Sequence, residues 1–128
     1  MALGDPISNP KSFHAEARFQ RVCMLCGRGG AFHAHHAVEK HILRRLGVPL
    51  YDTRCALRLC APPKPCHLTF EARMLVIPLV KLTDDNIEYA FEVLETDRAR
   101  EVGAPTAFDY LTRRYAGDDP RVTLGRAA

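Results

Sequence analysis

Four of the five cysteines stand in two close pairs, and these pairs constrain the fold more than any other feature of the chain. Cys23-Met24-Leu25-Cys26 has the two-residue spacing typical of a zinc knuckle, and Cys60 and Cys66 enclose a proline-rich segment. A closed tetrahedral zinc site requires four ligands, so we expect Cys23, Cys26, Cys60 and Cys66 to share one structural Zn²⁺ ion. Burial as small apolar side chains is the alternative for each pair.

The number and context of the cysteines favour metal binding over disulfides. Five is an odd number, so complete intramolecular pairing is excluded. The first six residues have neither a basic region nor an apolar stretch typical of an export signal, which predicts a reducing, cytoplasmic location. The longest apolar run, residues 74–80, is too short to span a bilayer, so no membrane partner is expected. For Cys55, three roles stay open: a buried thiol, an exchanged zinc ligand or an active-site residue.

Composition predicts one globular domain with a slight basic excess. Hydrophobic residues make up 47% of the 128 residues and charged residues 26%, and the net charge is +3. Arginine carries most of the positive charge, and its guanidinium group suits phosphate contacts. Arg54, Arg58 and the Arg113-Arg114 pair are therefore candidates for contacts with nucleic acid, although a solvated basic surface explains the charge equally well.

Hydrophobic periodicity and helix-stop residues predict an α+β fold. We expect a flexible arm over residues 1–11, a domain over 12–116 with a core of about 20–75 and C-terminal helices of about 83–115, and a frayed tail over 117–128. The expected helices cover residues 12–18 (an extended stretch is the alternative), 40–46 (a long loop is the alternative), 67–74, 84–96 and 105–115, the last with Phe108, Leu111 and Tyr115 on one face. The i, i+4 spacing of Phe13 and Ala17 indicates the first helix, and Gly47 is the expected stop of the second. Thr83 is the expected N-cap of the helix over 84–96, which has an acidic first turn and one apolar face: Asp84, Asp85, Ile87, Ala90, Phe91 and Leu94. Extended segments are expected over residues 21–27, 31–38 (as the second arm of a ribbon with 21–27) and 55–60.

Adjacent histidines point to metal chemistry. His35 and His36 lie next to each other in an expected strand, so their side chains leave on opposite sides, one toward a metal and the other toward a water. His67 follows Cys66, and Glu71 lies one helical turn further on the same face, so both could reach one ion. His33 shares its strand face with His35 and is expected at the surface or as a residue that supports a metal ligand, while His14 and His41 are expected to be solvated.

In this order, the motifs resemble a known family. They are Cys23-x2-Cys26, then Ala34-His35-His36-Ala37-Val38, then Tyr51-Asp52-x2-Cys55-Ala56-Leu57-x-Leu59-Cys60, then Cys66-His67. The pattern is similar to HNH endonucleases with a ββα-metal (His-Me finger) core, closest to the zinc-stapled bacteriophage type. The resemblance covers roughly residues 20–115.

This resemblance implies a site and an activity. His35 and His67 correspond to ligands of a catalytic divalent ion, Glu71 to a further ligand, and His36 to the general base. The four cysteines Cys23, Cys26, Cys60 and Cys66 correspond to the ligands of a structural zinc. The implied reaction is hydrolysis of DNA phosphodiester bonds with Mg²⁺, or another divalent ion such as Mn²⁺ or Ni²⁺. The implied partners are DNA and phage packaging proteins, and the implied location is the cytoplasm of a bacterial host.

Cys55 departs from the family pattern, because it stands where the motif has its asparagine. A thiol is a weaker hydrogen-bonding group than an amide. An alternative is therefore a zinc-stapled module with weakened or no catalysis that binds DNA or a protein. A third hypothesis is a purely structural zinc protein in which the histidines are incidental.

Overall fold

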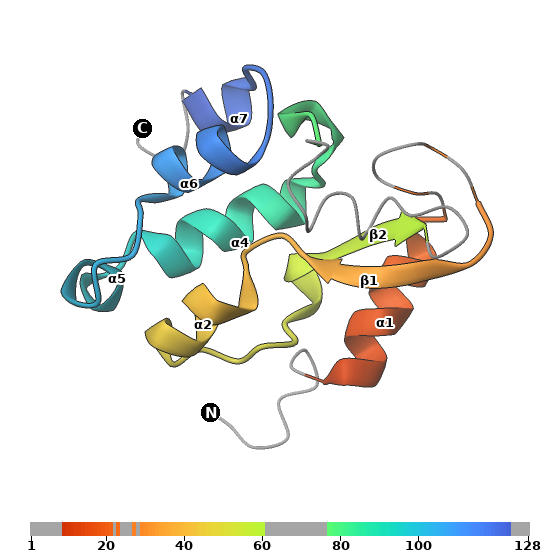
Figure 1. Ribbon diagram of the computed structural model, residues 1–128, viewed down its shortest axis with the longest axis horizontal. Helices are drawn as coiled ribbons and strands as arrows, with labels where there is room; N and C mark the ends of the chain where they lie inside the picture. The colour runs from red at the N-terminus through yellow and green to blue at the C-terminus, as the bar shows by residue number, and fades with distance from the viewer. Residues whose placement is uncertain (1–8, 22, 24–26, 28, 61–76, 124–128) are drawn as a thin grey trace.

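In a computed structural model, the chain adopts an α+β fold in which helices surround a two-stranded antiparallel sheet. The structure describes residues 9–21, 23, 27, 29–60 and 77–123. Figure 1 shows the sheet and helix α1 at one end of the molecule and helices α2, α4, α5 and α6 toward the other. The predicted α+β class is confirmed; the expected helix over residues 67–74 lies outside the described residues.

The sheet pairs two segments that are distant in sequence. Strand β1 (Phe32–His36) runs antiparallel to strand β2 (Ala56–Cys60), with His35 opposite Leu57 and His36 opposite Ala56. The strand near residues 55–60 was expected, but its pairing with β1 was not, since residues 21–27 were expected as the partner of β1; residues 22 and 24–26 of that segment lie outside the described residues. Of that segment, Arg21 has a left-handed backbone (φ +69°), and neither Cys23 nor Gly27 belongs to a strand. In this pairing His35 and His36 of β1 are buried, and Ala34 packs against the hydrophobic core.

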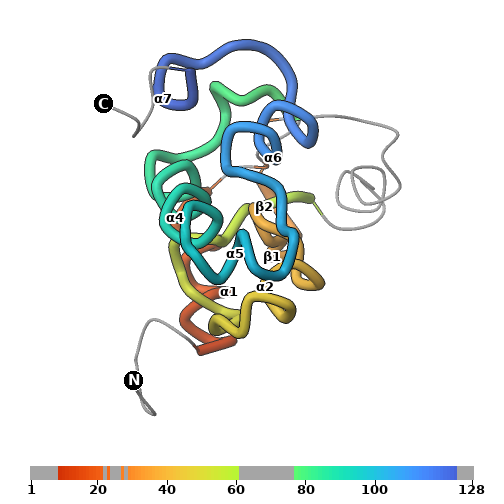
Figure 2. The backbone as a smooth tube through the Cα atoms, turned by 90° about the vertical axis from the view of Figure 1, so that its left-hand side faces the viewer, coloured from red at the N-terminus to blue at the C-terminus, as the bar shows by residue number. Residues whose placement is uncertain are grey.

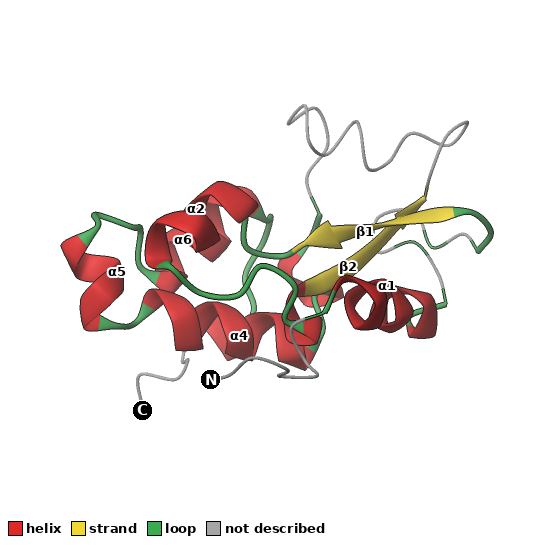
Figure 3. Ribbon diagram, turned by 90° about the horizontal axis from the view of Figure 1, so that it is seen from below, coloured by secondary structure: helices red, strands yellow, loops and turns green. Residues whose placement is uncertain are grey.

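Helix α1 (Pro10–Phe19) lies beneath the sheet and packs against both strands (Figure 3). Asn9 caps its first turn by accepting hydrogen bonds from the backbone of Lys11 and Ser12, and Pro10 occupies the first helical position. Phe13 and Ala17 form its buried face. The helix thus begins inside the segment that was expected to be a flexible arm.

A long connection that contains helix α2 joins β1 to β2. Helix α2 (Lys40–Leu46) ends at Gly47, whose left-handed backbone (φ +74°) accommodates the helix stop. The predicted helix over 40–46 is therefore confirmed. The chain then passes through the 3₁₀ turn η1 (Thr53–Cys55) into β2.

Helix α4 (Asp84–Leu94) lies in the middle of the helices on the side of the molecule away from α1 (Figure 1). Thr83 caps its start as predicted, and Asn86 completes a reciprocal capping box that was not predicted. A short turn, η2 (Leu79–Lys81), precedes it and α5 (Asp97–Glu101) follows it. Figure 2 shows α4 to the left of the sheet and α5 in front of it.

Two expectations for the C-terminal part need correction. Helix α6 (Ala107–Arg114) forms as predicted, but Phe108 is exposed and Tyr110 is buried beside Leu111 instead. Residues 120–123 were expected to fray, yet they form helix α7 (Pro120–Thr123), and Val122 is buried. Arg121 holds this end by donating hydrogen bonds to Asp119 and to the backbone oxygen of Leu82.

Among the described residues, no helix combines the length and the apolar character that crossing a membrane requires.

Candidate functional site

A hollow of about 700 Å³ lies where α1, β1 and the start of α2 meet. Many of its lining residues can donate or accept protons. The histidines that border it come from α1, β1 and α2: His14, His33, His35, His36 and His41. The predicted His35-His36 pair is thus at the wall of a concave site, together with His33, which was expected at the surface or supporting a metal ligand, and with His14 and His41, which were expected to be solvated.

His36 is held in place by three neighbours. Its Nε2 lies 2.7 Å from the backbone oxygen of Leu50, and its ring stacks on Phe13 with centroids 4.4 Å apart. The Tyr51 ring is the third neighbour, with its centroid 5.6 Å from that of the His36 ring. A carbonyl oxygen only accepts, so Nε2 carries the proton in the neutral ring and Nδ1 is left as the acceptor. The contacts select one tautomer and one ring orientation.

The protonation state of His36 follows from its burial. Only 7% of the residue is exposed, and this desolvation lowers its pKa to about 4, although the Leu50 carbonyl opposes the shift. The positive charges of Lys40 and Arg44 lower the pKa further. At neutral pH the imidazole is therefore uncharged and able to accept a proton.

His35 is buried in the same wall, next to His36 in β1. It supplies one imidazole nitrogen donor suited to a divalent ion. His67 and Glu71, the other expected ligands, lie outside the described residues, and the described part of the chain contains no group of three His, Cys, Asp or Glu arranged for a metal. The donor chemistry of His35 fits the expected catalytic ion, as one ligand of the set.

Two of the four expected zinc ligands are described, and both are buried: Cys23 before β1 and Cys60 at the end of β2. The Gly27 backbone nitrogen donates to the Cys23 carbonyl oxygen at 2.9 Å, and Gly27 has a φ of +77°. Cys26 and Cys66 lie outside the described residues.

Residues 37–39, which follow the histidine pair, are clamped by side chains from elsewhere in the chain. The Cys55 thiol accepts a hydrogen bond from the Val38 backbone nitrogen at 3.4 Å. Tyr115 donates to the Ala37 oxygen at 2.7 Å, and Tyr110 accepts from the backbone nitrogen of Glu39 at 3.0 Å. These contacts fix the exit of β1.

Cys55 is fully buried, which supports the buried-thiol role among the three that sequence left open. Burial raises the pKa of its thiol to about 12, so the thiol stays protonated and unreactive at neutral pH. The Cys55 sulfur therefore bonds to the segment that directly follows the histidine pair.

Most of the arginines expected to contact phosphate are engaged within the fold. Arg58 is buried over the Phe32 ring and donates to the backbone oxygens of Arg18 and Gly30. Arg54 forms ion pairs with Asp52 and Glu92, both at 2.8 Å.

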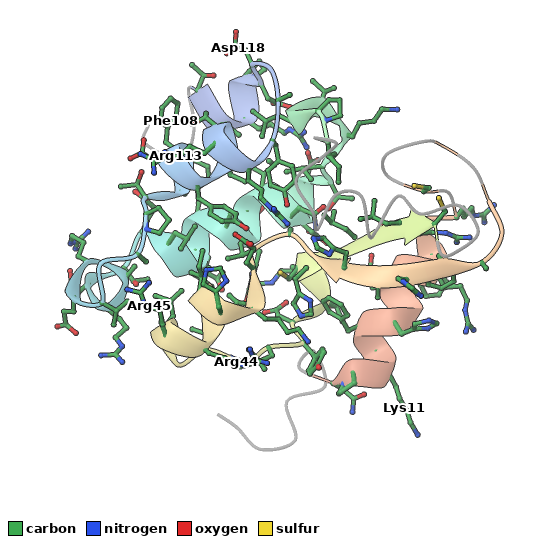
Figure 4. All side chains as sticks on the ribbon, viewed as in Figure 1. Lys11, Arg44, Arg45, Phe108, Arg113 and Asp118 are labelled. Atoms are coloured by element: carbon green, nitrogen blue, oxygen red, sulfur yellow. The ribbon has the colours of Figure 1, made fainter. Side chains whose placement is uncertain are left out.

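The two arginines at the end of α6 differ in exposure. Arg114 is buried, 3.9 Å from the Glu39 carboxylate. Arg113 alone of these candidates is exposed and labelled at the surface in Figure 4.

Sequence reasoning missed the aromatic residues that hold the site. Phe13 and Tyr110 fall within the helices predicted over residues 12–18 and 105–115, but neither was predicted to contact the site. Phe13 stacks on His36, 23 residues further along the chain, and Tyr110 bonds to Glu39, 71 residues before it. No local pattern reports such contacts; the spacing of Phe13 and Ala17 was the only available signal that one face of this helix is buried.

No protein-family model, no curated protein and no solved structure matches the chain.

Proposed function

We propose that this protein is an HNH-type endonuclease that hydrolyses DNA phosphodiester bonds, with His36 as the general base. The observation that carries the proposal is the restraint of the His36 ring by the Leu50 carbonyl and by Phe13. A base must be neutral, oriented and close to the reacting water. Restraint at Nε2 and a pKa lowered to about 4 by burial meet the first two requirements.

In the proposed reaction, the oxygen of a water molecule attacks the scissile phosphorus while Nδ1 of His36 takes a proton from that water. The bond from phosphorus to the 3′ oxygen breaks, and the electron pair leaves on that oxygen. The negative phosphate beside His36 would raise the pKa of the imidazole toward the working pH, which favours proton transfer. His35, with His67 and Glu71, would hold a divalent ion whose chemistry is to stabilise charge on the phosphate and on the departing oxygen.

The proposal includes a ββα-metal core with a zinc staple. Its support is the antiparallel pairing of β1 and β2, with His36 at the end of one strand and Cys60 at the end of the other. We assign Cys23, Cys26, Cys60 and Cys66 to the structural zinc. Such a site contributes to folding free energy, so strong chelators should unfold the protein.

The test is cleavage of supercoiled plasmid with Mg²⁺, Mn²⁺ or Ni²⁺ by the wild-type protein and by His36→Ala. We expect metal-dependent cleavage that falls by about 10²- to 10⁴-fold in the variant, the range for loss of a general base. Added imidazole should restore part of the activity, since it replaces the missing group. Equal thermal unfolding of the two proteins is the control for the fold.

Cleavage that is unchanged in His36→Ala would refute the assignment of the base. DNA binding without cleavage in any of the three metals would instead favour a zinc-stapled binding module. The observation that would explain this alternative is Cys55, whose thiol is a weaker anchor for residues 37–39 than an amide.

A further inference from the structure

Helix α1 carries a row of basic side chains beside the candidate site. Lys11, His14 and Arg18 are all exposed, and their spacing of three and four residues places them along one face of the helix. We name these three residues the α1 basic stripe. Glu16, the acidic residue of the helix, lies roughly 140° around the axis from Lys11 at 3.6 residues per turn. The positive charge is therefore sorted onto one side.

The stripe is continuous with the hollow that holds His36. A second hollow of about 380 Å³ runs along it, lined by Pro10, Lys11, His14, Ala15 and Arg18. Pro10 and His14 border both this hollow and the larger one. A chain bound along the stripe thus leads directly to the histidine wall.

The stripe is held rigidly relative to His36. Asn9 caps the start of the helix, and Phe13 on its buried face stacks on the His36 ring. His14 is itself fixed by stacking on Phe32, with centroids 4.7 Å apart. A ligand that binds the stripe is therefore placed at a defined distance from the candidate base.

Charge around the hollow favours an anionic ligand. Lys40 borders the hollow from α2, and Arg44 is exposed on the same helix. Figure 4 shows Lys11 and Arg44 at the same lower edge of the molecule. Among the described residues that line the larger hollow, Glu39 is the only acidic one, and Arg114 lies 3.9 Å from its carboxylate.

We propose that the α1 basic stripe binds the phosphate backbone of DNA beside the scissile phosphate; this inference rests on the proposed function. Lys11 and Arg18 are seven residues apart, or roughly 10 Å at 1.5 Å per residue. That length corresponds to about three nucleotides at 3.4 Å of rise per nucleotide in one strand. Contacts with phosphates carry no base information, so binding through the stripe is independent of DNA sequence.

The test measures binding of the full-length chain carrying His36→Ala, which removes cleavage from the measurement. A fluorescent duplex of about 30 base pairs is titrated between roughly 50 and 300 mM NaCl, because each phosphate contact contributes about 0.9 to the salt slope. The stripe variant is Lys11→Gln with Arg18→Gln. The matched control is Arg98→Gln with Arg100→Gln, which removes the same charge from exposed residues of α5, at the opposite end of the molecule from α1 (Figures 1 and 3).

We expect the stripe variant to lower the salt slope by about 1.8 and to weaken binding roughly 60-fold at 0.1 M salt, the sum of two lost contacts. The control should bind within about twofold of the parent, and Lys11→Arg with Arg18→Lys should retain binding. Circular dichroism checks that α1 stays folded in each variant.

Several outcomes would overturn the inference: equal binding by the stripe variant and the control, equal losses in both, or no measurable binding by the parent. Cleavage by the protein with native His36 separates this failure from failure of the proposed function. If that protein cleaves plasmid and the stripe changes are without effect on binding, the stripe assignment is wrong and the nuclease assignment stands. If no metal supports cleavage that depends on His36, the proposed function fails.

Discussion

Replacing Phe13 with alanine should both destabilise the protein and release the candidate base. Phe13 is 2% exposed, stacks on His36 at 4.4 Å and meets Tyr51 edge-on at 5.6 Å. Truncation of a buried phenylalanine costs about 3–5 kcal/mol, because apolar burial is lost and a cavity remains. Alanine recovers roughly 0.5 kcal/mol through its higher helix propensity. The net loss is a large share of the roughly 5–15 kcal/mol that holds a domain folded.

Phe19 offers a matched control on the same helix. It is 77% exposed, so Phe19→Ala removes the same atoms and gains the same helix propensity without opening a cavity. Urea unfolding followed by circular dichroism compares the two variants. With an m-value of roughly 1–3 kcal/mol/M, a loss of about 3 kcal/mol lowers the midpoint by at least about 1 M. Phe19→Ala should stay within about 0.5 kcal/mol of the parent.

Phe13→Leu separates packing from ring stacking. Leucine keeps most of the apolar volume, so the stability loss should be below about 1.5 kcal/mol. The stack on His36 is lost, so the nuclear magnetic resonance shifts of the His36 ring should move and cleavage should fall. Equal midpoints for Phe13→Ala and Phe19→Ala would refute the role of Phe13 in the core. Unchanged His36 shifts in Phe13→Leu would refute its role in positioning the base.

Three other predictions follow from buried groups. Tyr89→Phe should be neutral or stabilise the fold by up to about 1 kcal/mol in thermal unfolding, because the buried Tyr89 hydroxyl has no hydrogen-bond partner among the described residues; a loss of more than about 1 kcal/mol would contradict this. In the metal-free protein, His36 should titrate near pH 4 by nuclear magnetic resonance, because burial lowers its pKa. Its unfolded pKa is 6.5, so stability from the neutral ring is complete above that pH and is lost as the pH falls toward 4; a midpoint near 6.5 would overturn this. Cys55 should resist iodoacetamide at pH 8 until the protein is unfolded, because burial raises its thiol pKa to about 12; mass spectrometry of the Cys55 peptide tests this, and rapid labelling of the native protein would disprove it.

Short-range features of the chain determined much of the secondary structure. The Thr83 cap, the acidic first turn after it and the apolar spacing of Ile87, Ala90 and Leu94 predicted α4, because helix starts and faces depend on residues within two turns. Gly47 predicted the end of α2 for the same reason, since only the local backbone sets the stop.

Tertiary structure alone decided which strand pairs with β1. A pattern of alternating side chains identifies a strand but not its partner: the neighbouring segment 21–27 was expected beside β1, and the structure pairs β1 with β2. The start of β2 is held by α4, where Asn86 donates to the backbone oxygens of Arg54 and Ala56. Such contacts join residues about 30 positions apart, which no local pattern encodes.

For the candidate site as well, the sequence shows some features and only the tertiary structure decides others. The His35-His36 motif and the paired cysteines are visible in the sequence, since they depend on residue type and spacing. The environment of His36 is not, because Phe13 and Leu50 reach it only when α1 and the loop before η1 close over β1. Charge is sorted by the fold as well: burial takes Arg58 away from the surface, while α1 brings Lys11 and Arg18 to it. Residue type determined what chemistry the chain can offer, and packing decided which of those groups face the hollow, because exposure and pKa depend on neighbours that are distant in sequence.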